Sequence, residues 1–132
     1  MQTNRERVQL SGKEKNVLLV DDDALFVEML KEIIDDLFSE VQVANNVTEA
    51  LKMIEGKPYS IVMTDLEMPE INGVRLCEKI RETNNEQKLI VSTAHSDETY
   101  LLDLLKIGVD GFLKKPFRVE DLYGVLIKVL EN

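Results

Sequence analysis

The stretch NVLLVDDD, residues 16–23, combines a short continuous apolar run with three consecutive carboxylates. Four apolar residues in succession, 17–20, are typical of a strand that is buried on both faces of a parallel sheet. The carboxylates follow at the point where such a strand ends. Ligands of open α/β sheets bind beyond the carboxyl ends of the strands, so this position is a candidate ligand site.

Outward from this stretch, apolar runs alternate with segments of helical periodicity. The apolar runs predict five strands, over residues 17–20, 41–44, 60–63, 89–91 and 111–113. The segments between them predict five helices, over residues 24–38, from Asn46 onward, and over 74–81, 96–107 and 119–130. Five strands alternating with five helices imply an α/β domain in which a parallel sheet carries helices on both faces.

Local signals support the helix boundaries. Asp23, Asn46 and Ser96 precede predicted helices and belong to the residue types that accept hydrogen bonds at helix N-termini. Gly108 follows the fourth helix, as glycine commonly does at a helix end. Within the first helix, the apolar residues at helical spacing are Leu25, Met29, Ile33 and Leu37.

Composition excludes several classes of function. The chain has 132 residues, which fits one domain. The 16 Lys and Arg against 25 Asp and Glu give a net charge of −9, and an acidic surface repels the backbone of nucleic acids. No run reaches the ~18 apolar residues of a membrane span. We therefore expect that this domain binds neither nucleic acid nor a membrane.

Residues 1–15 are polar and are expected to form a flexible N-terminal extension or linker, which leaves residues 16–132 as the folded domain. They lack the apolar segment of a signal peptide. The single cysteine, Cys77, cannot form an internal disulfide, so we expect a cytoplasmic protein. Cys77 shares a helix face with Val74 and Ile80, which predicts a small apolar residue in or near the core.

Chemically functional residues follow four of the predicted strands. These strand ends carry Asp21-Asp22-Asp23, Thr64-Asp65, Ser92-Thr93 and Lys114-Lys115. Three carboxylates in one crevice repel each other and need a cation, and hard oxygen ligands favour Mg²⁺. A neighbouring lysine and hydroxyl would then hold a phosphoryl group, which a carboxylate can accept.

Four segments resemble, in order, the signature segments of the response-regulator receiver domain of two-component signalling. They are VLLVDDD (17–23), MTDLEMPEING (63–73), VSTAH (91–95) and GFLKKPF (111–117). The resemblance covers about residues 16–131. It implies a flavodoxin-like (βα)5 fold similar to that of the chemotaxis regulators. The implied sheet is doubly wound, with five parallel strands in the order 2-1-3-4-5.

The resemblance assigns the acceptor and the metal ligands. Asp65 resembles the phosphoacceptor, because it ends the third strand ahead of the Met-Pro and Gly pattern. Asp22 resembles the direct Mg²⁺ ligand, and Asp21 beside it would hold a metal-bound water. The backbone carbonyl of Glu67 would be a further ligand of the ion.

The resemblance also assigns the residues that read the phosphoryl group. Thr93 is similar to the hydroxyl residue that bonds a phosphoryl oxygen. Lys115 resembles the lysine that pairs with the acceptor and then with the phosphoryl group, and in this family the bond from that lysine to Pro116 is usually cis. Phe112 stands where the family often has a rotating tyrosine. Thr93 and Phe112 would together switch the face formed by residues 97–130.

Two positions that vary in the family are expected to tune the lifetime of the phosphorylated state. They are Glu67, two residues after the acceptor, and His95, two residues after the threonine. For Glu67 we expect slower loss of the phosphoryl group, because its carboxylate adds negative charge beside an anionic centre.

The implied partners are those of a signalling switch. A histidine kinase or a histidine phosphotransfer protein would supply the phosphoryl group. The switched face would bind a downstream protein, a fused output domain or a second copy of the chain as a homodimer. The domain would catalyse its own phosphorylation and dephosphorylation and would act on no outside substrate, so it is not an enzyme in the usual sense.

Simpler explanations compete at single residues. Asp23 is better explained as a helix cap, Lys114 as a solvated surface lysine and His95 as a surface-loop residue. Thr93 alone would be an ordinary β-branched strand residue.

Two other functions compete for the whole domain. An aspartate-nucleophile phosphohydrolase of the haloacid-dehalogenase type would match the D-x-D of Asp21 and Asp23, but Ala24-Leu25 follows instead of Gly-Thr. A degenerate receiver that only binds a partner would not need the intact set of acceptor, metal ligands, hydroxyl and lysine.

Overall fold

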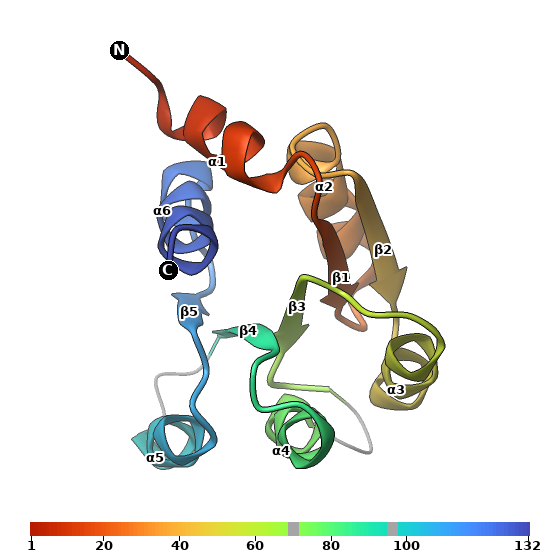
Figure 1. Cartoon of the computed structure of the whole chain (residues 1–132). Coiled ribbons are helices and arrows are strands. Elements are labelled where there is room, and N and C mark those ends of the chain that lie inside the picture. The colour runs from red at the N-terminus through yellow and green to blue at the C-terminus, as the bar shows by residue number, and fades with distance from the viewer. Residues whose placement is uncertain (69–71, 95–97) are drawn as a thin grey trace.

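The computed structural model describes residues 1–68, 72–94 and 98–132. Its strands are β1 (Asn16–Val20), β2 (Glu40–Ala44), β3 (Ile61–Asp65), β4 (Lys88–Thr93) and β5 (Gly111–Lys114). They form one parallel sheet in the order β2-β1-β3-β4-β5, which can be followed from right to left in Figure 1. The predicted doubly wound five-stranded fold and its strand order are confirmed.

Helices cover both faces of the sheet (Figure 1). One face carries α1 (Asn4–Gly12), α2 (Ala24–Ile34) and α6 (Val119–Leu130). The other face carries α3 (Val47–Gly56), α4 (Gly73–Thr83) and α5 (Glu98–Ile107). Two hydrophobic clusters result, one on each side of the sheet.

The continuous apolar run of β1 serves both clusters. Successive strand residues point to opposite faces. Val17 and Leu19 therefore pack with α2 and α6, while Leu18 and Val20 pack with α3 and α4. All four side chains are at most 1% exposed. A strand buried on both sides ends directly in Asp21, so the sheet's own core fixes the position of the first carboxylates.

Two predicted helix caps and one predicted helix end are confirmed. The Asp23 carboxylate accepts a hydrogen bond from the Phe26 amide at 3.1 Å, and the Asn46 side chain accepts one from the Glu49 amide at 2.8 Å. Gly108, with φ of +81°, ends α5 in the left-handed region that favours glycine. The predicted cap at Ser96 lies outside the described residues.

The predicted helix α2 is present, but the apolar residues at helical spacing do not coincide with its buried face. The buried side chains of this helix are Val27, Leu30 and Ile34. Leu25 and Met29 are instead 86% and 52% exposed. The helix ends at Ile34, and Leu37 lies in the turn beyond it, where its amide donates to the Ile34 carbonyl. The spacing identifies a helix, but contact with the sheet decides which of its apolar residues are buried.

Residues 4–12 form a helix rather than a flexible extension. Thr3 and Glu6 form a capping box at the N-terminus of α1. Val8 is fully buried in the cluster that includes residues of α2 and α6. Gly12 lies against Phe38, and a Cβ added there would come within 2.7 Å of the Phe38 ring. The helix escaped prediction because Val8 and Leu10 are its large apolar side chains and, two residues apart, they lie on opposite faces, so the helix has almost no apolar period.

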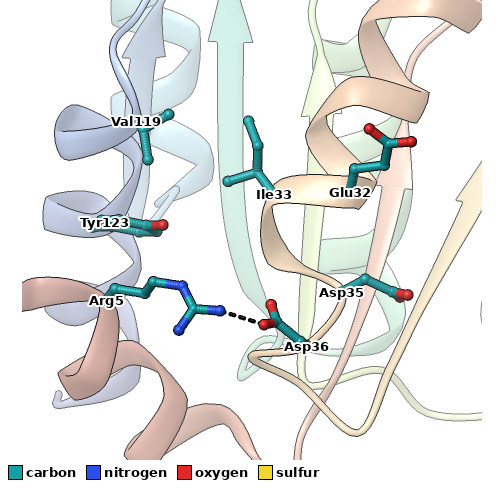
Figure 2. A pocket seen from close by; sticks show the side chains of 7 residues that line it. All are labelled: Arg5, Glu32, Ile33, Asp35, Asp36, Val119 and Tyr123. Carbon is teal, nitrogen blue, oxygen red and sulfur yellow. Dashed lines mark hydrogen bonds and ion pairs between the residues drawn. The ribbon is translucent and has the colours of Figure 1, made fainter.

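A groove lies where α1 meets α2 and α6 (Figure 2). Its volume is about 610 Å³, and Ile33, Val119 and Tyr123 supply much of its apolar lining. Arg5 of α1 forms an ion pair with Asp36, just beyond α2, across this groove. Arg7 forms a second ion pair with Glu131, just after α6, at 2.8 Å. These exposed pairs contribute little to stability, so the burial of Val8 is the main attachment of α1.

We expect Val8→Ala to lower the free energy of unfolding by about 1–2 kcal/mol, because it removes buried methyl groups from a packed cluster. Leu10→Ala is the matched control on the same helix, since Leu10 is 55% exposed. Urea unfolding of both variants measures the difference. Equal, near-zero effects would mean that α1 is not anchored through Val8.

Candidate functional site

The carboxyl ends of four strands meet at one edge of the sheet. The strand pairings place Val20 beside Thr64, Asp65 beside Ser92, and Thr93 beside Lys114. The chain reverses its direction of strand addition between β2 and β3, so this edge is also the topological switch point. The register brings the ends of β1, β3, β4 and β5 together at this edge, as predicted.

Three carboxylates form the acidic part of the site. Asp21, Asp22 and Asp65 each offer an oxygen within 4.8 Å of the others. Asp21 and Asp65 are only 4% and 5% exposed, whereas Asp22 faces solvent. Asp23 is not in this cluster, because its carboxylate caps α2. The arrangement offers hard oxygen donors on one side and an opening to solvent on the other, which fits an ion that keeps several waters.

Lys115 supplies a positive charge to the cluster. Its Nζ donates to Asp21 Oδ2 at 2.9 Å and lies 3.6 Å from Asp65 Oδ1. The same ammonium lies 4.2 Å from the centre of the Phe26 ring, a cation–π contact. The Lys115 amide is held by the Thr93 carbonyl at 2.8 Å, and the following bond to Pro116 is cis. The lysine therefore bonds Asp21 directly and only approaches Asp65.

The electrostatics of the cluster favour a bound cation. Burial, the nearby Asp21 and, to a smaller extent, the Glu67 carboxylate raise the pKa of Asp65 to about 7, although Lys115 opposes this rise. Burial alone would lower the pKa of Lys115, but the contact with Asp21 outweighs it and the pKa lies above its usual value. With Asp22 included, three carboxylates face one lysine. A divalent cation would relieve the repulsion that keeps Asp65 hard to ionise.

Asp65 has an atom that its surroundings do not satisfy. Among the described residues, Asp65 Oδ1 is the buried side-chain atom without a hydrogen-bond partner. Its nearest cation, Lys115, lies at 3.6 Å, beyond hydrogen-bonding distance. A buried polar atom without a partner costs free energy, so it is rare in native structures unless function or a bound group explains it.

The neutral donors of the site face a fourth carboxylate. The Thr93 hydroxyl donates to Glu67 Oε1, and the Ala94 amide lies 3.4 Å from Glu67 Oε2. Thr93 is 2% exposed at the end of β4. Sequence reasoning placed the backbone of Glu67 and the hydroxyl of Thr93 in one site but did not anticipate this contact between their side chains.

The remaining predicted residues lie outside this cluster. Phe112 is 41% exposed on β5 and lines a groove of about 600 Å³ with α6 residues that include Gly124 and Lys128. His95 lies outside the described residues. Cys77 is fully buried among apolar side chains, as predicted, and burial raises the pKa of its thiol to about 12.

A family model for the response regulator receiver domain matches residues 17–127. The chain belongs to this receiver-domain family. It is 31% identical over 116 residues to the chemotaxis protein CheY of Halobacterium salinarum, covering 88% of this chain and 97% of that protein. It is 26% identical over 114 residues to the signal transduction histidine-protein kinase BarA of Escherichia coli K12, covering 85% of this chain but 12% of BarA.

A solved structure of similar fold is the CheY-like receiver domain protein from Methanospirillum hungatei JF-1. It has a TM-score of 0.85 and 27% identity, and the match covers 90% of this chain and 95% of that one. Several curated relatives are much longer, and the chain spans only 12% to 19% of their length. In the described part of the chain, no helix has both the length and the apolar character that a membrane crossing requires.

Gly73 holds the end of β3 at Asp65 in place through a close backbone contact. The Gly73 amide donates to the Leu66 carbonyl at 3.0 Å. A Cβ on Gly73 would lie 2.2 Å from the Asp65 carbonyl oxygen, a distance that no side chain tolerates. The first residue of α4 therefore has to be glycine for the helix to start directly against the end of β3. This explains in physical terms why glycine closes the segment MTDLEMPEING.

We expect Gly73→Ala to destabilise the domain by about 1–3 kcal/mol or more, because the new methyl group meets rigid backbone. Gly124→Ala in α6 is the control, since nothing lies within 4 Å of its added Cβ. There alanine should stabilise the helix by about 0.5–1 kcal/mol. Thermal unfolding measures whether each variant is less or more stable than wild type. A Gly73→Ala variant of unchanged stability would refute the close-contact argument.

Proposed function

We propose that this receiver domain takes a phosphoryl group onto Asp65 from a histidine kinase or a histidine phosphotransfer protein. The observation that carries the proposal is Asp65 Oδ1, a buried carboxylate oxygen without a hydrogen-bond partner among the described residues. It lies at the carboxyl edge of the sheet, between an acidic cluster and Lys115. An oxygen held ready in this way is free to form a bond to phosphorus.

The residues present fit Mg²⁺. Asp22 and Asp65 would hold the ion directly, with the backbone carbonyl of Glu67 as a further ligand and Asp21 acting through a water. The exposed position of Asp22 supports this reading, because Mg²⁺ keeps several waters and takes few protein ligands. When bound, the ion would supply positive charge that lets Asp65 ionise and that offsets the charge of the phosphoryl oxygens.

In the transfer, Asp65 Oδ1 forms the new P–O bond as the P–N bond of the donor's phosphohistidine breaks. The electron pair of that bond leaves with the imidazole, which then takes a proton from solvent. Lys115 is placed to pair with a phosphoryl oxygen, since its Nζ already lies 3.6 Å from the accepting atom. Catalysis by this chain consists of positioning and electrostatics, as is usual for phosphoryl transfer.

The readout that we propose runs through β4 and β5. Thr93 would turn its hydroxyl to the phosphoryl group, and Phe112 would turn inward from its half-exposed position. Phe112 has no hydroxyl to bond at the surface, so its outward state should be less favourable than that of a tyrosine. The face formed by α5, β5 and α6 would then bind a downstream protein, a fused output domain or a second copy of the chain.

The relatives support these partners. BarA is a histidine-protein kinase, and the part of it that matches this chain is a short fraction of its length. CheY of H. salinarum matches over nearly its whole length. Receiver domains thus occur both joined to a kinase and as small separate proteins. Glu67 and His95 stay predicted tuning positions for the lifetime of the phosphorylated state.

The proposal predicts one phosphoryl group per chain after incubation with acetyl phosphate and Mg²⁺, measured by intact mass. Asp65→Asn should abolish this addition, because the amide cannot accept the group. Asp103→Asn is the control, since Asp103 is exposed on α5. Equal labelling of the Asp65 variant would refute the acceptor assignment. Steady release of phosphate from an outside phosphoester would instead favour a phosphohydrolase.

The proposed metal ligands predict a difference between two adjacent carboxylates. Wild type should bind Mg²⁺ with a Kd in the millimolar range, because few protein ligands reach the ion. Asp22→Asn should weaken binding about tenfold or more, and Asp23→Asn about twofold or less, because Asp23 serves as the cap of α2. NMR titrations with Mg²⁺ measure both. The reverse order would exchange the two roles.

A further inference from the structure

Glu67 contacts two hydrogen-bond donors that a phosphoryl group on Asp65 could use. Its carboxylate accepts from the Thr93 hydroxyl through one oxygen and lies 3.4 Å from the Ala94 amide through the other. Both donors sit at the end of β4, beside the strand that ends in Asp65. A carboxylate and a phosphoryl group offer such donors the same thing, two anionic oxygens.

A phosphoryl group would compete less with Glu67 for Lys115 than for Thr93 and Ala94. Its direct hydrogen bond goes to Asp21, and it approaches Asp65 without bonding it. An incoming phosphoryl group could therefore reach the lysine without displacing Glu67. To reach Thr93 and Ala94, however, it must take the place of the Glu67 carboxylate.

We propose that Glu67 is a built-in competitor that occupies the phosphoryl-oxygen site at Thr93 and Ala94 in the resting domain. This inference rests on the function proposed above and adds a residue that sets the rate of phosphorylation of Asp65. The contact keeps the buried Thr93 hydroxyl satisfied before phosphorylation. The phosphoryl group gains these donors only when the Glu67 side chain leaves them, so phosphorylation is slower than the acidic cluster and Lys115 alone would allow.

Neighbouring backbone bonds fix the reach of residue 67. The Leu66 amide donates to the Ser92 carbonyl at 2.9 Å, and the Leu66 carbonyl accepts from Gly73 at 3.0 Å. The main chain on this side of residue 67 is therefore held to β4 and α4. A side chain shorter by one methylene should fall short of Thr93. This makes Glu67→Asp a variant that keeps the negative charge but vacates the donors.

Three variants separate occupation of the site from simple charge repulsion. Glu67→Ala removes both the contact and the charge. Glu67→Asp removes the contact and keeps the charge, while Glu67→Gln removes the charge and keeps an oxygen acceptor at the same reach. Occupation predicts that the Asp variant gains more than the Gln variant. Repulsion alone predicts the opposite order.

The first measurement is the initial rate of labelling by acetyl phosphate with Mg²⁺, followed by intact mass. Initial rates exclude any effect of Glu67 on later loss of the group. Glu67→Ala and Glu67→Asp should be about three- to tenfold faster than wild type, a change of the size expected when one charge-assisted contact no longer has to be broken. The Gln variant should stay closer to wild type.

The second measurement needs neither phosphodonor nor metal. In ¹⁵N-labelled protein, Glu67→Ala and Glu67→Asp should shift the Ala94 and Thr93 amide signals, and Glu67→Gln should shift them less. A third measurement repeats the acetyl phosphate labelling in a Thr93→Val background, which lacks the donor hydroxyl. There Glu67→Ala should lose most of its gain in rate. Both readouts report the contact directly rather than a change in overall folding.

The outcomes distinguish this inference from the proposed function. If wild type is labelled but the Gln variant is faster than the Asp variant, or no variant differs, the competitor role is wrong and the acceptor role stands. If the Thr93 and Ala94 amide signals do not shift in Glu67→Ala, the contact itself is absent and the inference is wrong. If neither wild type nor any variant is labelled, the proposed function fails and this inference fails with it.

Discussion

The meeting of Asp21 and Asp65 at the carboxyl edge of the sheet is the constraint on which the rest of the site depends. The strand register brings both carboxylates there, and the double-sided core of β1 and β3 prevents either strand from moving away. Lys115 bonds Asp21 and leaves the buried Oδ1 of Asp65 unsatisfied. The site therefore holds more negative charge than its own residues balance. That imbalance favours a divalent cation, and under the proposed function the cation would offset the charge of an anionic phosphoryl group.

The uncharged hydrogen-bond donors of the site, the Thr93 hydroxyl and the Ala94 amide, already contact a carboxylate. Thr93 and Ala94 can serve an anion, and in the resting chain that anion is Glu67. In the proposed switch, a phosphoryl oxygen would replace the Glu67 carboxylate, so the buried Thr93 hydroxyl would keep a hydrogen-bond partner in both states. Thr93 pairs with Lys114, two residues along β5 from Phe112. A change in the orientation of Thr93 thus occurs beside the strand that carries the exposed aromatic side chain.

The sequence predicted the parts of this arrangement that depend on strand ends. Apolar runs located the strands, and parallel strands bring their ends together, so Asp21, Asp65, Thr93 and Lys115 followed from one rule. The sequence could not predict which partner Lys115 bonds, because the distances from its Nζ to the Asp21 and Asp65 carboxylates differ by less than 1 Å. The contact between the Lys115 ammonium and the Phe26 ring was also missed, because side-chain packing decides it. The helix α1 was also missed, although the T-x-x-E of Thr3 and Glu6 is a capping-box signal that had marked its start.

The position of α1 bears on how the domain can switch. This helix precedes β1 and packs along α6, and Arg7 pairs with Glu131 just after that helix. It therefore lies near the edge where β1 begins, away from Asp65 at the opposite end of the strands. Moving α6 as a body would expose Val8 and its neighbours in the cluster, at a cost that grows with the apolar area uncovered. Rotation of Phe112 on the edge strand β5 uncovers none of that cluster. The added helix thus favours a switch made by side chains on β4 and β5 over one made by displacement of α6.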